Sequence, residues 1–117
     1  MLYLESNGTI RLTRGDTAYL TVPIKIKDSN DDIEDYVMNS SDTLIFSVKK
    51  SIRDEEYSFQ KTIQGKNTIH IEPTDTAGLS FGKYKYDVQL TTSSGDVFTL
   101  VDTSDFEILS EVTVNVK

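Results

Sequence analysis

The strongest constraint on the fold is a strict alternation of apolar and polar residues at positions 17–27. The apolar side chains occupy every second position, so all of them would lie on one side of an extended strand. We therefore expect a β-strand with one buried and one exposed face. Pro23 has no backbone N–H to donate, which predicts a sheet edge or a bulge near the middle of this strand. The apolar positions are Ala18, Leu20, Val22, Ile24 and Ile26.

Alternating segments recur at intervals of about ten residues, a spacing typical of an antiparallel β-sandwich or barrel. The chain has nine Val, ten Ile and fourteen Thr but two Ala, and β-branched residues favour strands whereas alanine favours helices. We expect about seven or eight strands, in a single domain that covers residues 1–117. Besides residues 17–27, the expected strands are residues 8–13, 43–51, 57–63, 68–72, 83–92, 97–101 and a last strand through Phe106 and Ile108.

The connections between these strands carry further expectations. Residues 75–79 are predicted to form one helical turn. Tyr84, early in a late strand, is a candidate for a tyrosine corner, in which the hydroxyl group bonds back to the preceding connection; the alternative is an ordinary core aromatic. In the polar connection after the first long strand, Tyr36 and Met38 either form a short strand or pack on the core rim. Residues 112–117 alternate again and either add a strand or extend towards a neighbouring domain or subunit.

Charge, cysteine and histidine usage exclude several kinds of function. The net charge of −7 argues against a nucleic-acid backbone or an anionic membrane as the main partner, because both require a basic surface. The chain has no cysteine and one histidine, which excludes disulfides, thiolate metal sites and multi-histidine metal centres. No apolar run approaches the ~20 residues of a bilayer span. The N-terminal sequence lacks the pattern of a signal peptide, so we expect synthesis in the cytoplasm without secretion by that route.

A dense cluster of oxygen-bearing side chains follows the first long strand. Asp28, Asn30 and Asp32 have the alternate spacing of the first three ligands of a calcium-binding loop, and they are the candidate metal ligands of this chain. The rest of the pattern fails, because Ile33 stands where such a loop needs glycine and Asn39 stands where it needs a bidentate glutamate. A solvated acidic loop is therefore the favoured interpretation, and no metal or cofactor is predicted.

The tripeptide Arg14-Gly15-Asp16 spells a known integrin-recognition sequence. Three residues recur often by chance, and these three stand where two strands must be joined. Gly15 can adopt the positive φ of a tight turn without a steric penalty. We therefore interpret the tripeptide as a turn and not as an adhesive motif.

Two ring-bearing residues are the remaining candidates for chemistry or binding. His70 lies between two isoleucines, so alternation places it on the exposed face of its strand, and nothing in the sequence nominates the nucleophile and carboxylate that general-base catalysis would need. Tyr19 also faces outward and could stack on a sugar, although a lone exposed tyrosine is more often a good strand former. The chain also lacks a nucleophile elbow and a glycine-rich phosphate loop, so we predict no catalytic residue and no enzymatic activity.

Several longer phrases, taken together, resemble small structural proteins encoded in phage and prophage modules of Gram-positive bacteria. The resemblance covers nearly the whole chain and implies an antiparallel immunoglobulin-like β-sandwich of the baseplate or tail-fibre adaptor type. It carries over no functional residue, because the matched positions are turn-and-strand signatures. The phrases are IRLTRGDT (10–17), DTLIFSVKK (42–50), DTAGLSFGKYKYDVQL (75–90), GDVFTL (95–100) and FEI to EVT (106–113).

The sequence therefore predicts a non-enzymatic phage or prophage structural protein, a component of the virion baseplate, tail or fibre. Its expected partners are other virion proteins in a homo- or hetero-oligomer, bound through exposed edge strands or through the alternating tail. No nucleic acid and no membrane is expected as a partner. The alternative is a carbohydrate-binding or adhesive β-sandwich module that acts at a bacterial surface, with a sugar as its ligand.

Overall fold

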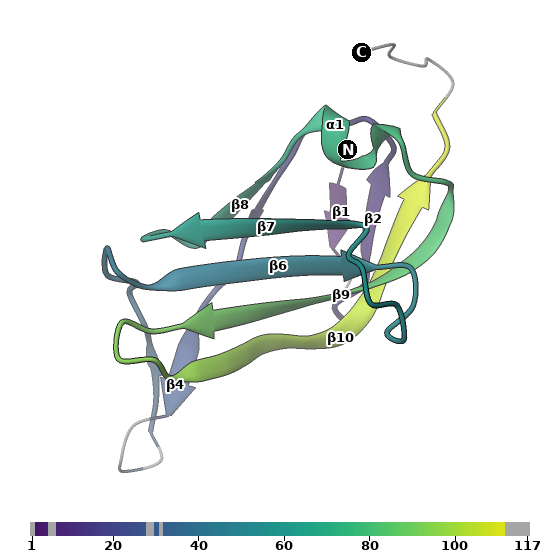
Figure 1. The fold of residues 1–117 in the computed structure, drawn as a ribbon. Helices are drawn as coiled ribbons and strands as arrows, with labels where there is room; N and C mark the ends of the chain where they lie inside the picture. The colour runs from purple at the N-terminus through teal and green to yellow at the C-terminus, as the bar shows by residue number, and fades with distance from the viewer. Residues whose placement is uncertain (1, 5–6, 28–29, 31, 112–117) are drawn as a thin grey trace.

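The structure is a computed structural model that describes residues 2–4, 7–27, 30 and 32–111 of the 117-residue chain. Within this part the chain is mostly β, as predicted (Figure 1). The elements are β1 (Leu2–Leu4), β2 (Ile10–Thr13), β3 (Ala18–Thr21), β4 (Lys25–Lys27), β5 (Ile33–Asp35), β6 (Thr43–Lys49), β7 (Phe59–Gln64), β8 (Thr68–Ile71), α1 (Pro73–Ala77), β9 (Gly82–Thr91) and β10 (Val97–Leu109).

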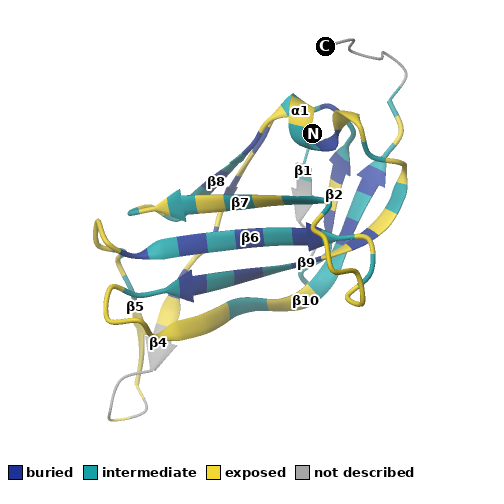
Figure 2. Cartoon of the chain, viewed as in Figure 1, coloured by how far each residue is buried: buried dark blue, intermediate teal, exposed yellow. Residues whose placement is uncertain are grey.

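These strands form one large sheet and two smaller pairs. The six-stranded sheet has the order β1-β2-β10-β9-β6-β7, while β3 pairs with β8 and β4 pairs with β5. Alternate residues on one face of the large sheet are buried, as the banding along β6 and β9 in Figure 2 shows. The buried residues of the β3–β8 pair belong to the same hydrophobic core, so this pair packs against that face.

Aromatic rings fill the middle of the core. Phe46, Phe59, Tyr86 and Phe106 lie within 5.5–6.2 Å of one another, measured between the ring centroids of each contacting pair. Most of these pairs are tilted or edge-on, the arrangements that aromatic quadrupoles favour. Because the rings come from β6, β7, β9 and β10, this cluster ties the central strands of the large sheet together.

The predicted strand at residues 17–27 is divided in two. β3 ends at Thr21 and β4 begins at Lys25, so in place of the edge or bulge predicted at Pro23 there is a complete break between two strands. The chain remains anchored there, because the Val22 backbone N–H donates to the Asn67 carbonyl (2.9 Å) and the Asn67 side-chain amide donates to the Val22 carbonyl (2.8 Å). Val22 and Ile24 are still buried, so the predicted inward positions are right even where the strand is not continuous.

The expectation of a wholly antiparallel arrangement is wrong at one pair of strands. β10 runs parallel to β2, with Phe106 opposite Ile10 and Ile108 opposite Leu12. A parallel pair needs a long connection, which the chain between β2 and β10 supplies. Alternation along a strand defines its two faces but contains no information about which distant strand lies beside it or in which direction, so this pairing was not visible in the sequence.

The two strands predicted after residue 96 form one long strand, β10. Its register against β9 shifts between Thr99 and Val101 and again between Val101 and Ser104. Such bulges bend a strand and increase its twist. Figure 1 shows the result, since the first half of β10 lies at the rim of the sheet and the second half turns to lie between β9 and β2.

The polar connection and the N-terminus contain strands that the sequence analysis did not predict, namely β5 and β1. β5 pairs with β4 in antiparallel register. Tyr36 and Met38 are partly buried against the core, which confirms packing on the core rim as the correct one of the two alternatives.

The helical turn begins earlier than predicted, at Pro73 rather than at residue 75. Proline is favoured in the first turn of a helix, and the Asp75 carboxylate accepts a hydrogen bond from the Glu72 backbone N–H at 2.7 Å. Asp75 also forms an ion pair with Lys61 (2.7 Å). This contact explains why a lysine occupies an inward position of β7 among apolar neighbours.

The tyrosine corner predicted at Tyr84 is confirmed. Its ring is buried, and its hydroxyl group donates to the Ser80 carbonyl oxygen at 2.9 Å, which binds the start of β9 to the preceding connection. The next inward residue, Tyr86, makes a long-range contact instead, because its hydroxyl group donates to the Gly8 carbonyl. Burial raises the pKa of Tyr86 to about 12, so this donor keeps its proton at neutral pH.

Candidate functional site

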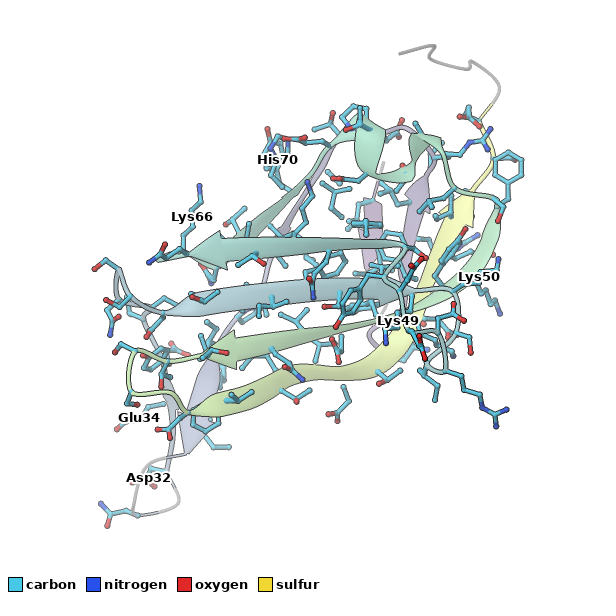
Figure 3. The ribbon with its side chains drawn as sticks, viewed as in Figure 1. Asp32, Glu34, Lys49, Lys50, Lys66 and His70 are labelled. Atoms are coloured by element: carbon cyan, nitrogen blue, oxygen red, sulfur yellow. The ribbon has the colours of Figure 1, made fainter. Side chains whose placement is uncertain are left out.

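The outer face of the six-stranded sheet, opposite the core, carries a pocket of about 310 Å³. Outward-facing side chains of β6, β7 and β9 supply most of the lining, together with the inward-facing Tyr86 of β9, one residue of β10 and the connection between β6 and β7. Lys49, labelled in Figure 3, stands at the end of β6 beside this connection. The lining residues are Ile45, Ser47, Lys49, Ile52, Tyr57, Gln60, Lys85, Tyr86, Asp87, Gln89 and Thr103.

A row of polar side chains crosses the three central strands of this pocket. Ser47 of β6 is in register with Asp87 of β9 on one side and with Gln60 of β7 on the other. Side chains directly opposite each other in a sheet lie ~5 Å apart at Cβ. The Gln60 amide nitrogen donates to the Ser47 hydroxyl oxygen at 2.8 Å. The row therefore places a carboxylate, a hydroxyl group and an amide side by side on the pocket floor.

The charges in the pocket are nearly balanced. Lys49 and Lys85 are register partners, and like charges directly opposite are unfavourable. Each has a compensating neighbour, because Lys85 forms an ion pair with Asp105 and Lys49 lies over the Tyr57 ring, 5.0 Å from its centroid.

Asp87 is the pocket carboxylate that burial affects most clearly. Its side chain is half-buried, and this desolvation raises its pKa, while the positive charge of Lys49 acts in the opposite direction. Among the described residues, none donates a hydrogen bond to the Asp87 carboxylate. The group is thus an acceptor in the pocket that no described residue uses.

The rim of the pocket is apolar and accessible. Tyr57 and Ile52 are 50% and 66% exposed. They belong to the β6–β7 connection, which is fixed at its end by a hydrogen bond from the Ser58 N–H to the Val48 carbonyl (2.7 Å). The sequence analysis placed Tyr57 inside a strand with an inward side chain; this is wrong, because β7 begins at Phe59 and Tyr57 lies at the pocket rim.

A second candidate surface is the first half of β10, residues 97–103, which we call the open half. It pairs with β9 on one side, but β2 pairs only with residues 106–109, so in the described part of the chain the open half has no ladder partner on its other side. Val97 and Phe98 are 57% and 38% exposed. Unpaired backbone groups beside exposed apolar side chains are a template for strand addition.

The turn that precedes the open half is held by Asp42. This fully buried carboxylate accepts hydrogen bonds from the Ser93 N–H (3.0 Å) and the Asn39 N–H (3.1 Å). The Tyr36 hydroxyl group also donates a hydrogen bond to it, which is the largest cause of a lowered pKa at Asp42 and of a raised pKa at Tyr36. The connection before β6 and the turn before β10 therefore meet at one charge.

The residues predicted as metal ligands do not form a described site. Asp28 lies outside the described residues, whereas Asn30 and Asp32 are exposed. Figure 3 shows Asp32 and Glu34 in the β4–β5 region at one end of the molecule. In the part of the chain that the structure describes, no three acidic or histidine side chains are grouped as a metal site would need.

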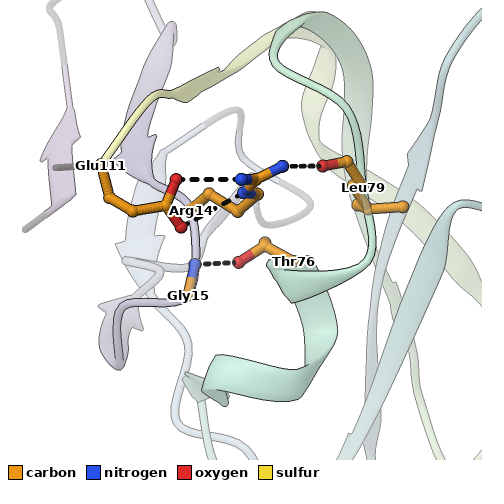
Figure 4. A network of polar contacts seen from close by, with 5 residues as sticks. All are labelled: Arg14, Gly15, Thr76, Leu79 and Glu111. Atoms are coloured by element: carbon orange, nitrogen blue, oxygen red, sulfur yellow. Dashed lines mark hydrogen bonds and ion pairs between the residues drawn. The ribbon is translucent and has the colours of Figure 1, made fainter. Parts of the chain in front are cut away.

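The turn predicted at Arg14-Gly15-Asp16 is confirmed, and its arginine is fixed in place (Figure 4). Gly15 has φ +81°, and its N–H donates to the buried Thr76 hydroxyl oxygen at 2.8 Å. The Arg14 guanidinium contacts both carboxylate oxygens of Glu111, at 3.1 and 3.2 Å, and donates to the Leu79 carbonyl at 3.2 Å. The arginine is thus used to hold the chain after β10 against the α1 connection.

Tyr19 and His70 lie on the exposed face of the β3–β8 pair, as predicted. They are register partners, and their rings stack at 4.5 Å between centroids with an interplanar angle of 8°. This stack covers one face of the Tyr19 ring, the ring that the sequence analysis nominated for a sugar. His70 is labelled in Figure 3 near α1.

The pocket was not predicted from the sequence. Most of its lining residues are outward-facing positions of predicted strands, but their proximity depends on the register between strands, and Ile52 and Thr103 lie outside the predicted strands. One signal was present in the sequence, since Ile45 is an apolar residue on the outward face of its strand. The pairing of Lys49 with Lys85 appears only in the register.

No family model, curated protein or solved structure matches the chain. The resemblance to phage structural proteins is not tested by these comparisons and stays a prediction. In the described part of the chain, no helix is long and apolar enough to cross a bilayer.

Proposed function

We propose that this chain is a non-enzymatic structural protein of a phage or prophage-encoded particle, in its baseplate, tail or fibre, and that it acts through contacts with other virion proteins. The proposed fold is an immunoglobulin-like β-sandwich, with the six-stranded sheet and the β3–β8 pair as its two layers. The shared hydrophobic core and the tyrosine corner at Tyr84 support this fold.

The observation that carries the proposal is the open half of β10. Proteins that stay monomeric usually cover, shorten or charge such an edge. Here Val97 and Phe98 remain exposed beside it, and the acidic Asp102 is the one charged residue of the open half. A strand from a neighbouring virion protein could pair with this edge through backbone hydrogen bonds, which is a common mode of assembly.

The resemblance of the ordered sequence phrases to phage structural proteins supports the same assignment. It predicts turn-and-strand elements over nearly the whole chain and no catalytic motif. The proposal therefore assigns no catalytic, metal-binding or cofactor-binding residue, and it places the chain in the particle after synthesis in the bacterial cytoplasm.

The experiment is co-expression of the full chain with the other products of a phage structural module, followed by affinity purification and by mass spectrometry of purified particles. We expect at least one of these products to co-purify and the chain to be present in the particles. If no product binds and the chain is absent from particles, the proposed function is wrong.

Lysines added to the open half of β10 test whether this edge is the site of contact with the partner. The double variant Val97→Lys with Thr99→Lys places two ammonium groups at the open half without touching the core, since both positions are exposed. We expect co-purification to fall at least ~10-fold. The matched control is Tyr19→Lys, an equally exposed strand position on the β3–β8 pair, which should leave co-purification unchanged. Equal losses in both variants would contradict the edge as the contact.

A further inference from the structure

We propose that the pocket on the outer face of the six-stranded sheet binds a neutral saccharide. This site is distinct from the contact in the proposed function, because it lies on the face of the sheet, whereas the open half of β10 offers its backbone edge; the two surfaces share Thr103. Four properties of the lining residues support the inference: their hydrogen-bonding groups, their apolar rim, their charge balance and the size of the pocket.

Saccharide hydroxyl groups both donate and accept, so a site for them needs donors and acceptors side by side. The row Gln60–Ser47–Asp87 provides this arrangement on the pocket floor. The Gln60 amide nitrogen is already bound to Ser47, and no described residue donates to the Gln60 amide oxygen, which can accept from a ligand. The Asp87 carboxylate accepts no hydrogen bond from the described residues, and it lies where a ligand hydroxyl group could donate to it.

The rim supplies the apolar surface that the C–H faces of a sugar ring require. Half of the Tyr57 residue is exposed, and aromatic rings combine apolar contact with a polar end. Ile52 adds an aliphatic surface on the same connection, and Ile45 adds one on the floor. A purely polar ligand would leave these three side chains without contact.

The charge balance favours a neutral ligand over an ionic one. A phosphate or carboxylate group would meet the positive charge of Lys49 but also the negative charge of Asp87. A cationic ligand would meet the negative charge of Asp87 but also the positive charge of Lys49. The charge of Lys85 is already neutralised by Asp105. Hydroxyl groups satisfy both kinds of partner, because the lysines donate and the carboxylate accepts.

The size of the pocket limits the ligand to one or two sugar units. Its volume of about 310 Å³ stands at the lower end of the ~300–1,000 Å³ typical of small-molecule sites. A longer glycan would extend beyond the pocket into solvent. The pocket would therefore recognise one or two units of a chain.

The experiment uses the full chain on an array of neutral and acidic oligosaccharides, followed by an amide NMR titration with the neutral glycan that gives the strongest signal. We expect neutral glycans to be retained and the side-chain amide signals of Gln60 and Gln89 to shift. Tyr57→Ala and Asp87→Asn should each weaken the affinity at least ~10-fold. Asp87→Asn removes a half-buried charge and keeps the shape of the side chain, so this variant should fold even if another does not.

The control is Tyr19→Ala, which removes the other exposed ring nominated for a sugar and leaves the pocket intact. It should bind as the unchanged chain does. The proposal is overturned if no neutral glycan is retained, if acidic glycans alone are retained, or if Tyr19→Ala rather than Tyr57→Ala abolishes binding. If a virion protein, and no glycan, shifts the side-chain amide signals of Gln60 and Gln89, the proposal is also overturned and the pocket is identified as a protein contact.

Discussion

The two halves of β10 differ although they belong to one strand. The open half has β9 on one side, and five of its seven residues are exposed. The second half, residues 104–109, lies between β9 and β2 and contributes the buried Phe106 and Ile108 to the core. The same strand thus stabilises the fold at one end and remains available for contacts at the other.

Each half is also held by a different carboxylate. Asp42 fixes the turn before the open half through Ser93, and Glu111 fixes the chain after the second half through Arg14. The difference between the halves therefore does not arise because one end of β10 is less firmly held than the other. It arises from what lies on the far side of the strand, which is β2 in one case and no described strand in the other.

The largest expected effect is the loss of a core ring in the second half. Phe106→Ala should lower the free energy of unfolding by about 3–5 kcal/mol, since Phe106 is fully buried among the core aromatic rings. Phe98→Ala in the open half should cost about 1 kcal/mol or less, because that side chain is already 38% exposed. Urea unfolding of both variants measures the difference. Equal losses would show that the two halves contribute equally to the core.

The next largest effect concerns the ion pair between Arg14 and Glu111, which anchors the chain after the second half of β10. Arg14→Ala should lower the free energy of unfolding by about 1–3 kcal/mol, because it leaves the mostly buried Glu111 carboxylate without its partner. The matched control is Arg11→Ala, whose ion pair with Glu107 is more exposed and should contribute about 1 kcal/mol or less. If Arg14→Ala and Arg11→Ala have the same effect in thermal unfolding, the anchor contributes no more than a surface ion pair.

The alternation of apolar and polar residues encodes which face of each strand is buried, and this part of the fold could be predicted from the sequence. The prediction at residues 43–51 became β6 with the expected faces, since the side chains of a strand alternate whatever lies beside it. The tyrosine corner at Tyr84 was also predictable, because it is a local contact with Ser80.

Pairing and register could not be predicted in the same way. β10 lies beside β2 in a parallel ladder, and this contact depends on residues far apart in the sequence. The pocket has the same origin, because Gln60, Ser47 and Asp87 become neighbours only through two registers. The sequence showed the outward positions but not which of them would meet.

A smaller effect is a loss of stability in acid, to which the Asp42 and Glu111 carboxylates, the two anchors, both contribute. The Tyr36 hydroxyl group and two backbone N–H groups lower the pKa of Asp42, and Arg14 lowers the pKa of Glu111. A carboxylate with a lowered folded-state pKa contributes stability that is complete above its unfolded-state pKa, ~4 for Asp and Glu, and that is lost as the pH falls through the folded value. Urea midpoints measured from neutral pH to below pH ~4 should therefore decrease.

Substitution of Asp42 distinguishes the two anchors. Asp42→Asn removes the titrating group before the open half, so the pH dependence should become shallower and the Ser93 amide should exchange faster with solvent. Asp87→Asn should act in the opposite direction on the pH dependence, since burial raises the pKa of Asp87 and a raised carboxyl pKa favours the folded state in acid. An unchanged pH profile in Asp42→Asn would assign the acid sensitivity to the other carboxylates with a lowered pKa, Glu111 and Asp105.

The smallest expected effect is at the open half itself. Val97→Lys with Thr99→Lys should leave the free energy of unfolding within about 0.5 kcal/mol of the unchanged chain at each position, because both side chains are exposed at an edge without a described partner strand. Urea unfolding at low protein concentration tests the isolated chain. A loss clearly above 1 kcal/mol would mean that something covers this edge in the folded monomer, and the contrast between the two halves of β10 would then be wrong. If the stability is unchanged, the variant is folded as the unchanged chain is. Any loss of partner binding in this variant would then come from the altered edge and not from unfolding.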